Sequence, residues 1–82
     1  MARREDLIRA VELADAGAWE EAHAIAQRHG GDATADWLHA VLHKIEGDAD
    51  NSRYWYGRVA HTFEEYADPQ AERTAIRATL DR

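Results

Sequence analysis

Hydrophobic residues recur along the chain at intervals of three and four positions, which is the spacing of one face of an α-helix. No segment alternates hydrophobic and polar residues in the manner of a strand. The pattern predicts five helices: residues 3–16, residues 19–29, a third that starts after Asp32 or Thr34 and ends at Gly47, a fourth from near 48–50 to about 67, and a fifth from 69 onward. We therefore expect an all-α protein, with residues 1–82 as a single helical domain of two helix-turn-helix hairpins plus a C-terminal helix.

Glycine and proline mark the boundaries between these helices. Gly17 and Gly47 each follow a periodic segment, and glycine is the usual residue just past a helix C-terminus. Asp68 followed by Pro69 is a helix-start signal, because proline costs least at the first helical position. The boundaries and the hydrophobic periodicity therefore agree with each other.

The fourth and fifth helices differ in how much they can bury. The fourth predicted helix has an aromatic-rich stripe that we expect in the core: Trp55, Tyr56, Val59, Phe63 and Tyr66. The fifth is rich in alanine and poor in large hydrophobic residues, and a short helix of this kind is marginal alone in water. We expect it to pack on the fourth helix or on a second subunit.

Composition restricts the function more than the fold. Sixteen acidic and ten basic residues give a net charge of −6, which disfavours nucleic acid as a partner. The absence of cysteine and the presence of a single serine, Ser52, leave few nucleophiles and no thiolate metal ligands. No apolar run approaches the roughly 20 residues of a membrane span, and no signal peptide is recognised. These features predict a cytoplasmic protein without membrane or nucleic-acid partners.

An internal repeat relates the two halves of the chain. Residues 15–29 align with residues 45–59, with a glycine before a helix in both copies, and Ala10 corresponds to Ala40 in the preceding helices. A period near thirty residues with one helical hairpin in each unit is typical of helical-repeat arrays. In these features the chain resembles the tetratricopeptide-repeat family, which implies two stacked helical hairpins. His39 and His43 stand where that family has an aliphatic and an aromatic residue.

A second resemblance covers residues 35–58, "ADWLHAVLHKIEGDADNSRYWYGR". This segment resembles a group of short, uncharacterised bacterial helical proteins with an ADWxHAxLHxxEGDxxNxxYWYxR-type pattern. The resemblance implies membership of that group and no particular activity.

Three residues that can bind metal share one stripe of the third predicted helix. His39, His43 and Glu46 are spaced four and three positions apart, so their side chains stack along the helix. Two imidazoles and a carboxylate can hold Zn²⁺ or another divalent ion with one position left open. The zinc-protease motif is absent, however, because the residue after the first histidine is Ala40 rather than glutamate. His23 is interpreted separately, as a residue at the edge of the hydrophobic face of its own helix.

The same stripe has a structural interpretation, which the sequence favours. The turn at Gly47 returns the chain alongside the third helix, so the stripe is expected to meet residues of the fourth helix. The predicted polar cluster consists of His39, His43, Glu46, Asn51, Tyr54 and Arg58. Such a cluster either fixes the geometry of the hairpin or forms the floor of a ligand site.

Two functions follow from these observations. The first is a non-enzymatic helical interaction or adaptor domain that binds a protein partner or forms a homo-oligomer, with no cofactor and no catalytic residue. The alternative is a protein that binds a metal, such as zinc, or a small ligand through the helix face of His39, His43 and Glu46. The composition favours a role other than catalysis, since the chain is poor in nucleophiles.

Overall fold

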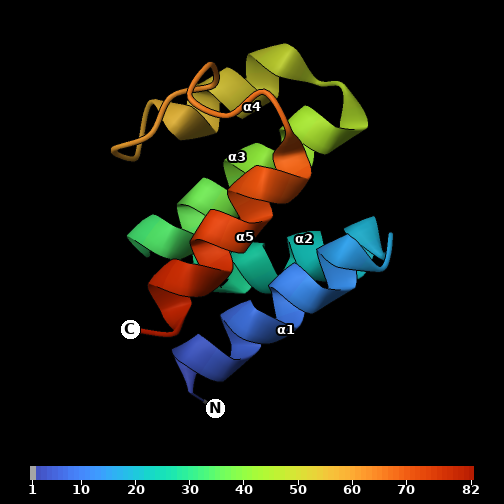
Figure 1. Ribbon diagram of the computed structural model, residues 1–82, viewed down its shortest axis with the longest axis vertical. Helices are drawn as coiled ribbons and strands as arrows, with labels where there is room; N and C mark the ends of the chain where they lie inside the picture. The colour runs from blue at the N-terminus through green and yellow to red at the C-terminus, as the bar shows by residue number, and fades with distance from the viewer. Residues whose placement is uncertain (1) are drawn as a thin grey trace.

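The computed structural model describes residues 2–82, and within this range it contains five α-helices and no strand. The helices are α1 (Arg3–Asp15), α2 (Trp19–Arg28), α3 (Ala33–Glu46), α4 (Ala49–Tyr56) and α5 (Pro69–Leu80) (Figure 1). The prediction of an all-α fold with five helices is confirmed. Consecutive helices pack as two pairs, α1 with α2 and α3 with α4.

Helix α3 lies at the centre of the molecule. It packs against α2, α4 and α5 and also touches α1, and in Figure 1 it runs through the middle with α5 alongside. Every residue from 35 to 43 is buried as a result, including polar ones. A helix that is enclosed on all sides has no solvent face on which to place its polar residues. The histidines of α3 are therefore inside the protein.

The predicted boundary residues cap the helices. Asp32, Asp48 and Asp68 precede α3, α4 and α5, and each side chain accepts a hydrogen bond from a backbone N–H group of the first turn. Gly17 and Gly47 adopt the left-handed conformation, with φ of 83° and 86°, which glycine reaches without a steric penalty. These local signals fix where α1 ends and where α3 begins and ends.

The fourth helix is shorter than the hydrophobic pattern predicts. It ends at Tyr56, and residues 57–68 form a non-helical connection. Of the aromatic stripe expected in the core, Tyr56 is buried, whereas Phe63 and Tyr66 are only partly buried and pack against the core. The Nζ atom of Lys44 donates hydrogen bonds to the carbonyl oxygens of Phe63 and Tyr66, at 2.8 and 3.1 Å. The connection is thus held by a cation from α3 instead of by helical hydrogen bonds.

The fifth helix packs along α3 and α1 and meets α4 through the hydrogen bond from Tyr56 to Glu72, so the expected docking along the fourth helix is wrong. Its buried apolar residues are Ile76 and Leu80, both of which belong to the core. These two large residues anchor the alanine-rich helix against α3 and α1.

A buried carboxylate joins α5 to the rest of the protein. Glu72 has no exposed surface, and its Oε2 atom accepts hydrogen bonds from Trp37 Nε1 at 2.8 Å and from the Tyr56 hydroxyl at 2.6 Å. Its Oε1 atom accepts from Lys44 Nζ at 2.9 Å. Burial, which is the largest cause, and the contacts with this carboxylate raise the pKa of Tyr56 well above its ordinary value. Glu72 thereby links three helices and the connection that Lys44 holds.

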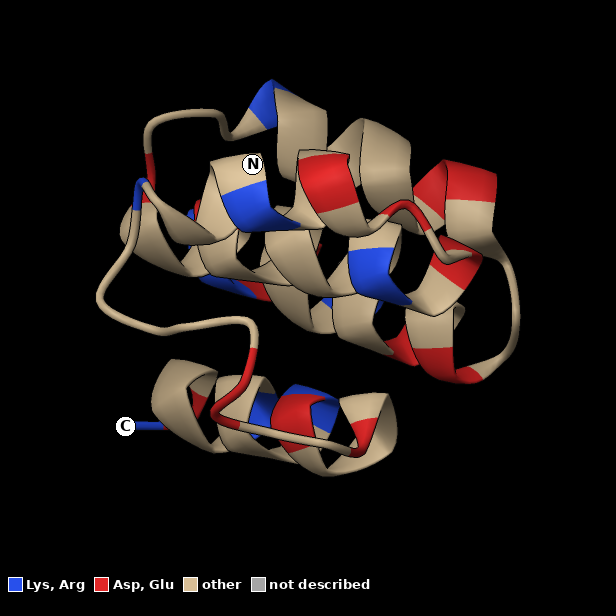
Figure 2. Ribbon diagram, turned by 90° about the horizontal axis from the view of Figure 1, so that it is seen from above, with Lys and Arg blue, Asp and Glu red and all other residues tan. Residues whose placement is uncertain are grey.

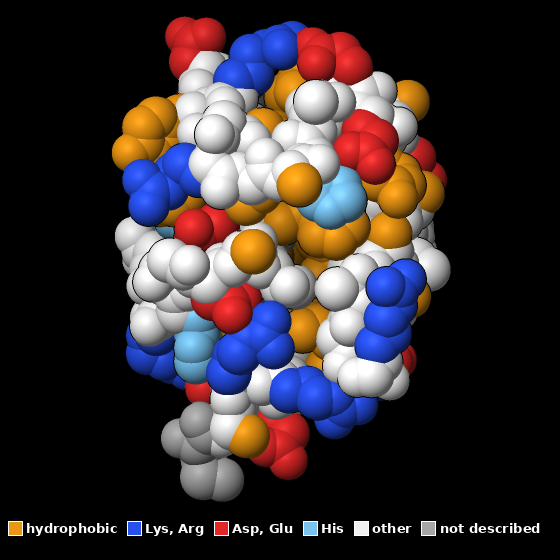
Figure 3. All heavy atoms as spheres, turned by 90° about the vertical axis from the view of Figure 1, so that its left-hand side faces the viewer, with side chains coloured by type: hydrophobic (Ala, Val, Ile, Leu, Met, Phe, Trp, Pro, Cys, Tyr) orange, Lys and Arg blue, Asp and Glu red, His pale blue; other side chains and the backbone are white. Residues whose placement is uncertain are grey.

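The surface carries charges of both signs. Lys and Arg are interspersed with Asp and Glu along the helices in Figure 2, and in Figure 3 hydrophobic side chains lie between charged ones. In residues 2–82, none of the helices has both the length and the hydrophobicity needed to cross a membrane.

Candidate metal centre

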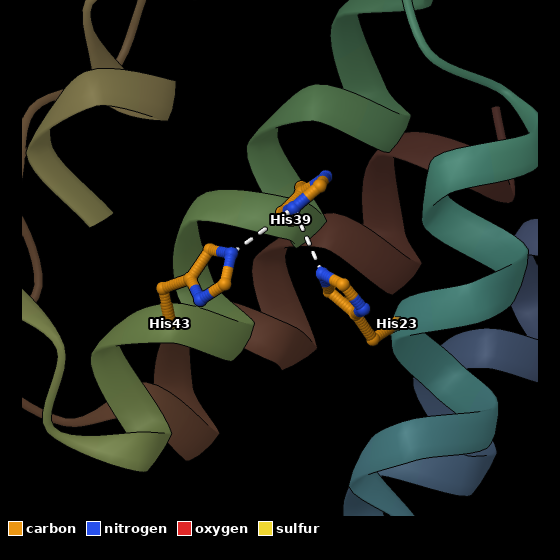
Figure 4. A group of neighbouring side chains, drawn as sticks. All are labelled: His23, His39 and His43. Atoms are coloured by element: carbon orange, nitrogen blue, oxygen red, sulfur yellow. Dashed lines mark hydrogen bonds between the residues drawn. The ribbon is translucent and has the colours of Figure 1, made fainter. Parts of the chain in front are cut away.

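Three histidines from two helices meet between α2 and α3. His23 comes from α2, and His39 and His43 come from adjacent turns of α3 (Figure 4). The Nε2 atom of His39 lies 3.0 Å from Nε2 of His23 and 3.1 Å from Nε2 of His43. One ring nitrogen from each histidine lies within 4.8 Å of the other two. We call these three residues the histidine trio.

The predicted stripe is present, but Glu46 contributes to it differently from the expectation. Its Oε1 atom lies 2.6 Å from Nδ1 of His43, the ring nitrogen that faces away from His39. Glu46 therefore accepts a hydrogen bond from His43 and does not share a point of convergence with both histidines. The third converging nitrogen belongs to His23. Sequence reasoning had placed that residue at a helix edge.

The remaining members of the predicted polar cluster lie apart from the trio. Asn51 takes part in the cap of α4 through its backbone N–H, and Arg58 Nη1 donates to the Tyr54 hydroxyl at 3.3 Å. Among the described residues, no hydrogen bond joins Asn51, Tyr54 or Arg58 to a histidine of the trio. Arg58 approaches the trio only through Trp55, which stacks on His39. Its guanidinium lies 5.2 Å from the centre of the Trp55 ring.

The contacts inside the trio cannot all be good hydrogen bonds. An imidazole nitrogen has a single in-plane position, occupied either by a proton or by a lone pair. When His43 donates from Nδ1 to Glu46 and is neutral, its Nε2 presents a lone pair to His39. A proton on His39 Nε2 then serves His43 or His23, but not both in good geometry. The same three nitrogens are better satisfied when all of them present lone pairs to one cation.

The spacing of the nitrogens fits a tetrahedral ion. Zinc–imidazole bonds of about 2.0–2.1 Å at tetrahedral angles place two ligand nitrogens about 3.3 Å apart. The separations of 3.0 and 3.1 Å around His39 are within a few tenths of an ångström of that edge. The nitrogens of His23 and His43 lie within 4.8 Å of each other, so a central ion requires these two rings to turn toward one another.

Each ring of the histidine trio is supported by a neighbouring side chain. Trp19 stacks on His23, with ring centres 4.6 Å apart, and Trp55 stacks on His39 at 3.9 Å. His43 is oriented by its bond to Glu46. A carboxylate on the far nitrogen of a ligating histidine is a frequent arrangement around metals, since it fixes the tautomer and raises the basicity of the ligand.

One of these supports is itself tied to the third helix. The indole Nε1 of Trp19 donates to the backbone carbonyl of Leu42 at 2.6 Å. Because Leu42 lies in the turn between His39 and His43, this bond holds the start of α2 against the helix that carries these two histidines. The position of His23 relative to α3 is therefore set by a direct hydrogen bond as well as by packing.

His39 is the most deeply enclosed and the least satisfied member. It is 3% exposed, and its Nδ1 is the one buried side-chain nitrogen or oxygen among the described residues without a hydrogen-bond partner. Burial, together with the adjacent rings of His23 and His43, lowers the pKa of His39 to about 4. Burial is also the main cause that lowers the pKa of His23. Both rings are accordingly neutral near pH 7, which is the form that binds metal.

The depressed pKa values predict that the metal-free protein loses stability in mild acid. Unfolded histidines take up protons as the pH falls through 6.5, whereas His39 in the folded protein does so only near pH 4. Since the unfolded state then binds more protons, the free energy of unfolding should decrease between these two values. The lowered pKa values of Glu64, Asp6 and Asp32 act below about pH 4.5, so the interval from pH 6.5 to 4.5 reports on the histidines.

Urea denaturation of the chelator-treated protein at a series of pH values measures this effect. The variant His39→Leu should show a smaller decrease between pH 6.5 and 4.5. A stability that is constant over that interval in the parent protein would contradict the burial of a neutral His39.

Comparisons with known proteins give no relative from which a function can be transferred. No family model, curated protein or solved structure matches the chain. The proposals below therefore rest on the residues and contacts of this chain alone.

Proposed function

We propose that this protein binds one divalent transition-metal ion, of which zinc is the leading candidate, through His23, His39 and His43. The observation that carries this proposal is the convergence of three histidine nitrogens from two helices, all within 4.8 Å of one another and with both separations from His39 close to a tetrahedral edge. The sequence had given metal binding as the alternative to an interaction domain. The inclusion of His23 and the orienting role of Glu46 make it the better-supported function.

The donor set selects the class of ion. Imidazole nitrogen suits Zn²⁺, Cu²⁺, Ni²⁺ and Co²⁺, whereas Mg²⁺ and Ca²⁺ prefer carboxylate, carbonyl and water oxygens. The trio offers three nitrogens, and Glu46, its nearest bonded carboxylate, is engaged with the far side of His43. We therefore expect ions of the zinc group and weak or no binding of Mg²⁺ and Ca²⁺.

A purely structural role explains the trio less well. A buried polar group without a partner costs about 1–3 kcal/mol, and replacing such groups by apolar ones of similar shape can be neutral or stabilising. His39 has one ring nitrogen without a partner and another whose single proton or lone pair faces two neighbours. A leucine would fill this interior position at lower cost, so a histidine there is best explained by a bound cation.

Zinc should raise the melting temperature of the protein substantially. An ion that binds only the folded state contributes about 2.7 kcal/mol at a concentration one hundred times its dissociation constant. For a domain of this size each kcal/mol corresponds to roughly 4–8 °C, which predicts a rise on the order of 10 °C or more. Thermal denaturation followed by circular dichroism, on protein prepared without a histidine tag, measures the rise.

Two comparisons make this test specific. The variant His61→Gln removes a histidine outside the trio and should respond to zinc as the parent does, while His23→Ala should respond weakly. Addition of Mg²⁺ should have little effect on either. Equal melting temperatures for the parent with zinc and with chelator would contradict the proposal.

An interaction role, the first function favoured by the sequence, is the second proposal and has less support. Ile45 and Tyr54 are the large hydrophobic side chains that are exposed among the described residues, at 40% and 58%. Isolated exposed hydrophobic residues are common on proteins that have no partner at that place. A cytoplasmic location and a self-associating or adaptor function stay predictions from the sequence, and sedimentation of the metal-free and zinc-bound protein tests the self-association.

A further inference from the structure

The histidine trio supplies three ligands, and a structural zinc site requires four. Closed structural sites are built from four protein donors, whereas three donors leave a position for an exogenous ligand. Among the described residues, no fourth potential metal donor lies close to all three histidines. Glu46 is bonded to the outward nitrogen of His43 and does not fill that position.

The charge of the site favours an anion as the fourth ligand. Three neutral imidazoles leave the full double charge of the ion uncompensated within its first shell. The surroundings are poor in polar groups, because the indole rings of Trp19 and Trp55 lie flat against two of the ligands. A charge in such surroundings is screened less than in water, so a ligand of opposite sign is bound more strongly there.

The histidines differ in their access to solvent. His39 and His43 are 3% and 6% exposed, whereas His23 is only partly buried. A ligand that exchanges with solvent therefore reaches the ion from the side of α2. The indole rings of Trp19 and Trp55 cover the faces of His23 and His39, which favours a small ligand over a bulky one.

We propose that the ion bound by the trio keeps one exchangeable coordination position, and that this position takes small monodentate anions, with hydroxide as the ligand when no other anion is present. This inference rests on the proposed function, since it concerns the same site. A water molecule at the position loses a proton to the solvent and becomes hydroxide, and on three-histidine zinc this ionisation occurs near pH 7. Carboxylates, bicarbonate and azide compete for the same position because each offers one negatively charged donor atom.

Cobalt provides the probe, since Co²⁺ accepts zinc ligands and its visible absorption depends on coordination number and ligand type. The tag-free protein is loaded with one equivalent of Co²⁺ and titrated with sodium azide at constant ionic strength, and separately from pH 6 to pH 9. We expect an intense four-coordinate spectrum that changes with azide to a 1:1 end point. We also expect one ionisation in the neutral range, which azide suppresses.

The outcomes separate this inference from the function on which it rests. A cobalt spectrum typical of bound, low-coordinate metal that responds to neither azide nor pH would overturn the exchangeable position and leave metal binding intact. Absence of any protein-bound cobalt spectrum, with no change in melting temperature, would overturn both. The variant His61→Gln should reproduce the response of the parent, and His23→Ala should give only the spectrum of hydrated cobalt.

Discussion

Replacing Glu72 by alanine is expected to unfold most of the protein at room temperature. The substitution leaves the ammonium group of Lys44 buried without its carboxylate and removes the acceptor for Trp37 and Tyr56. Breaking a buried ion pair by removing one partner costs about 3–5 kcal/mol, which is most of the stability of a small domain at the low end of the usual range of about 5–15 kcal/mol. Urea denaturation, or the helical circular dichroism of the purified variant if it is largely unfolded, measures the loss.

The exposed pair of Glu64 and Arg53 provides the matched control. Their side chains lie 2.6 Å apart but remain 65% and 53% exposed, and exposed pairs contribute little to stability. Glu64→Ala should therefore melt close to the parent. A Glu72→Ala variant that also melts close to the parent would show that the buried carboxylate does not hold α5 in place.

Replacing His39 by leucine should abolish metal binding without unfolding the protein. Leucine has nearly the volume of the imidazole ring, and the substitution removes a buried nitrogen that has no partner. Stability should therefore be unchanged or increased. Metal affinity, by contrast, should fall strongly, because a direct ligand is removed. Loss of a residue that only supports a ligand typically lowers metal affinity by about 10–100-fold, and the decrease here should be larger. Isothermal titration with zinc, paired with urea denaturation of the metal-free variant, measures both quantities.

The direction of the stability change separates the two interpretations of the trio. If His39 serves only the packing of α2 and α3, the leucine variant should lose its stacking with Trp55 and become clearly less stable. His61→Gln, which lies outside the trio, should bind zinc with the affinity of the parent. A destabilised His39→Leu variant that retains zinc affinity would contradict the metal site.

Much of the fold is encoded by local signals that a single sequence displays. Glycines with positive φ and aspartates that cap the next helix set the boundaries of α1 and α3, and these were predicted. The end of α4 was not predicted, because residues 56, 63 and 66 keep a helical spacing although the chain between them is irregular. Side chains at that spacing are buried equally well by a folded connection. The bonds that hold this connection come from Lys44, which lies 19 and 22 positions before the residues it contacts.

The candidate site is likewise predictable from the sequence only in part. The placement of His39, His43 and Glu46 on one stripe follows from helix geometry alone and is observed. His23 joins them only because α2 packs beside α3, which is a tertiary relation that periodicity along one helix does not reveal. The predicted repeat offers a signal for this contact, since stacked hairpins would place the second helix of one unit beside the first helix of the next.

The central claim is most directly tested by X-ray absorption at the zinc edge, on tag-free protein loaded with one equivalent of zinc. The account predicts three imidazole nitrogens at about 2.0 Å, with the multiple-scattering pattern of histidine, and one additional light-atom ligand. The His61→Gln variant should give the same spectrum. A shell of six oxygen ligands, or a histidine signal that persists unchanged in His39→Leu, would contradict it.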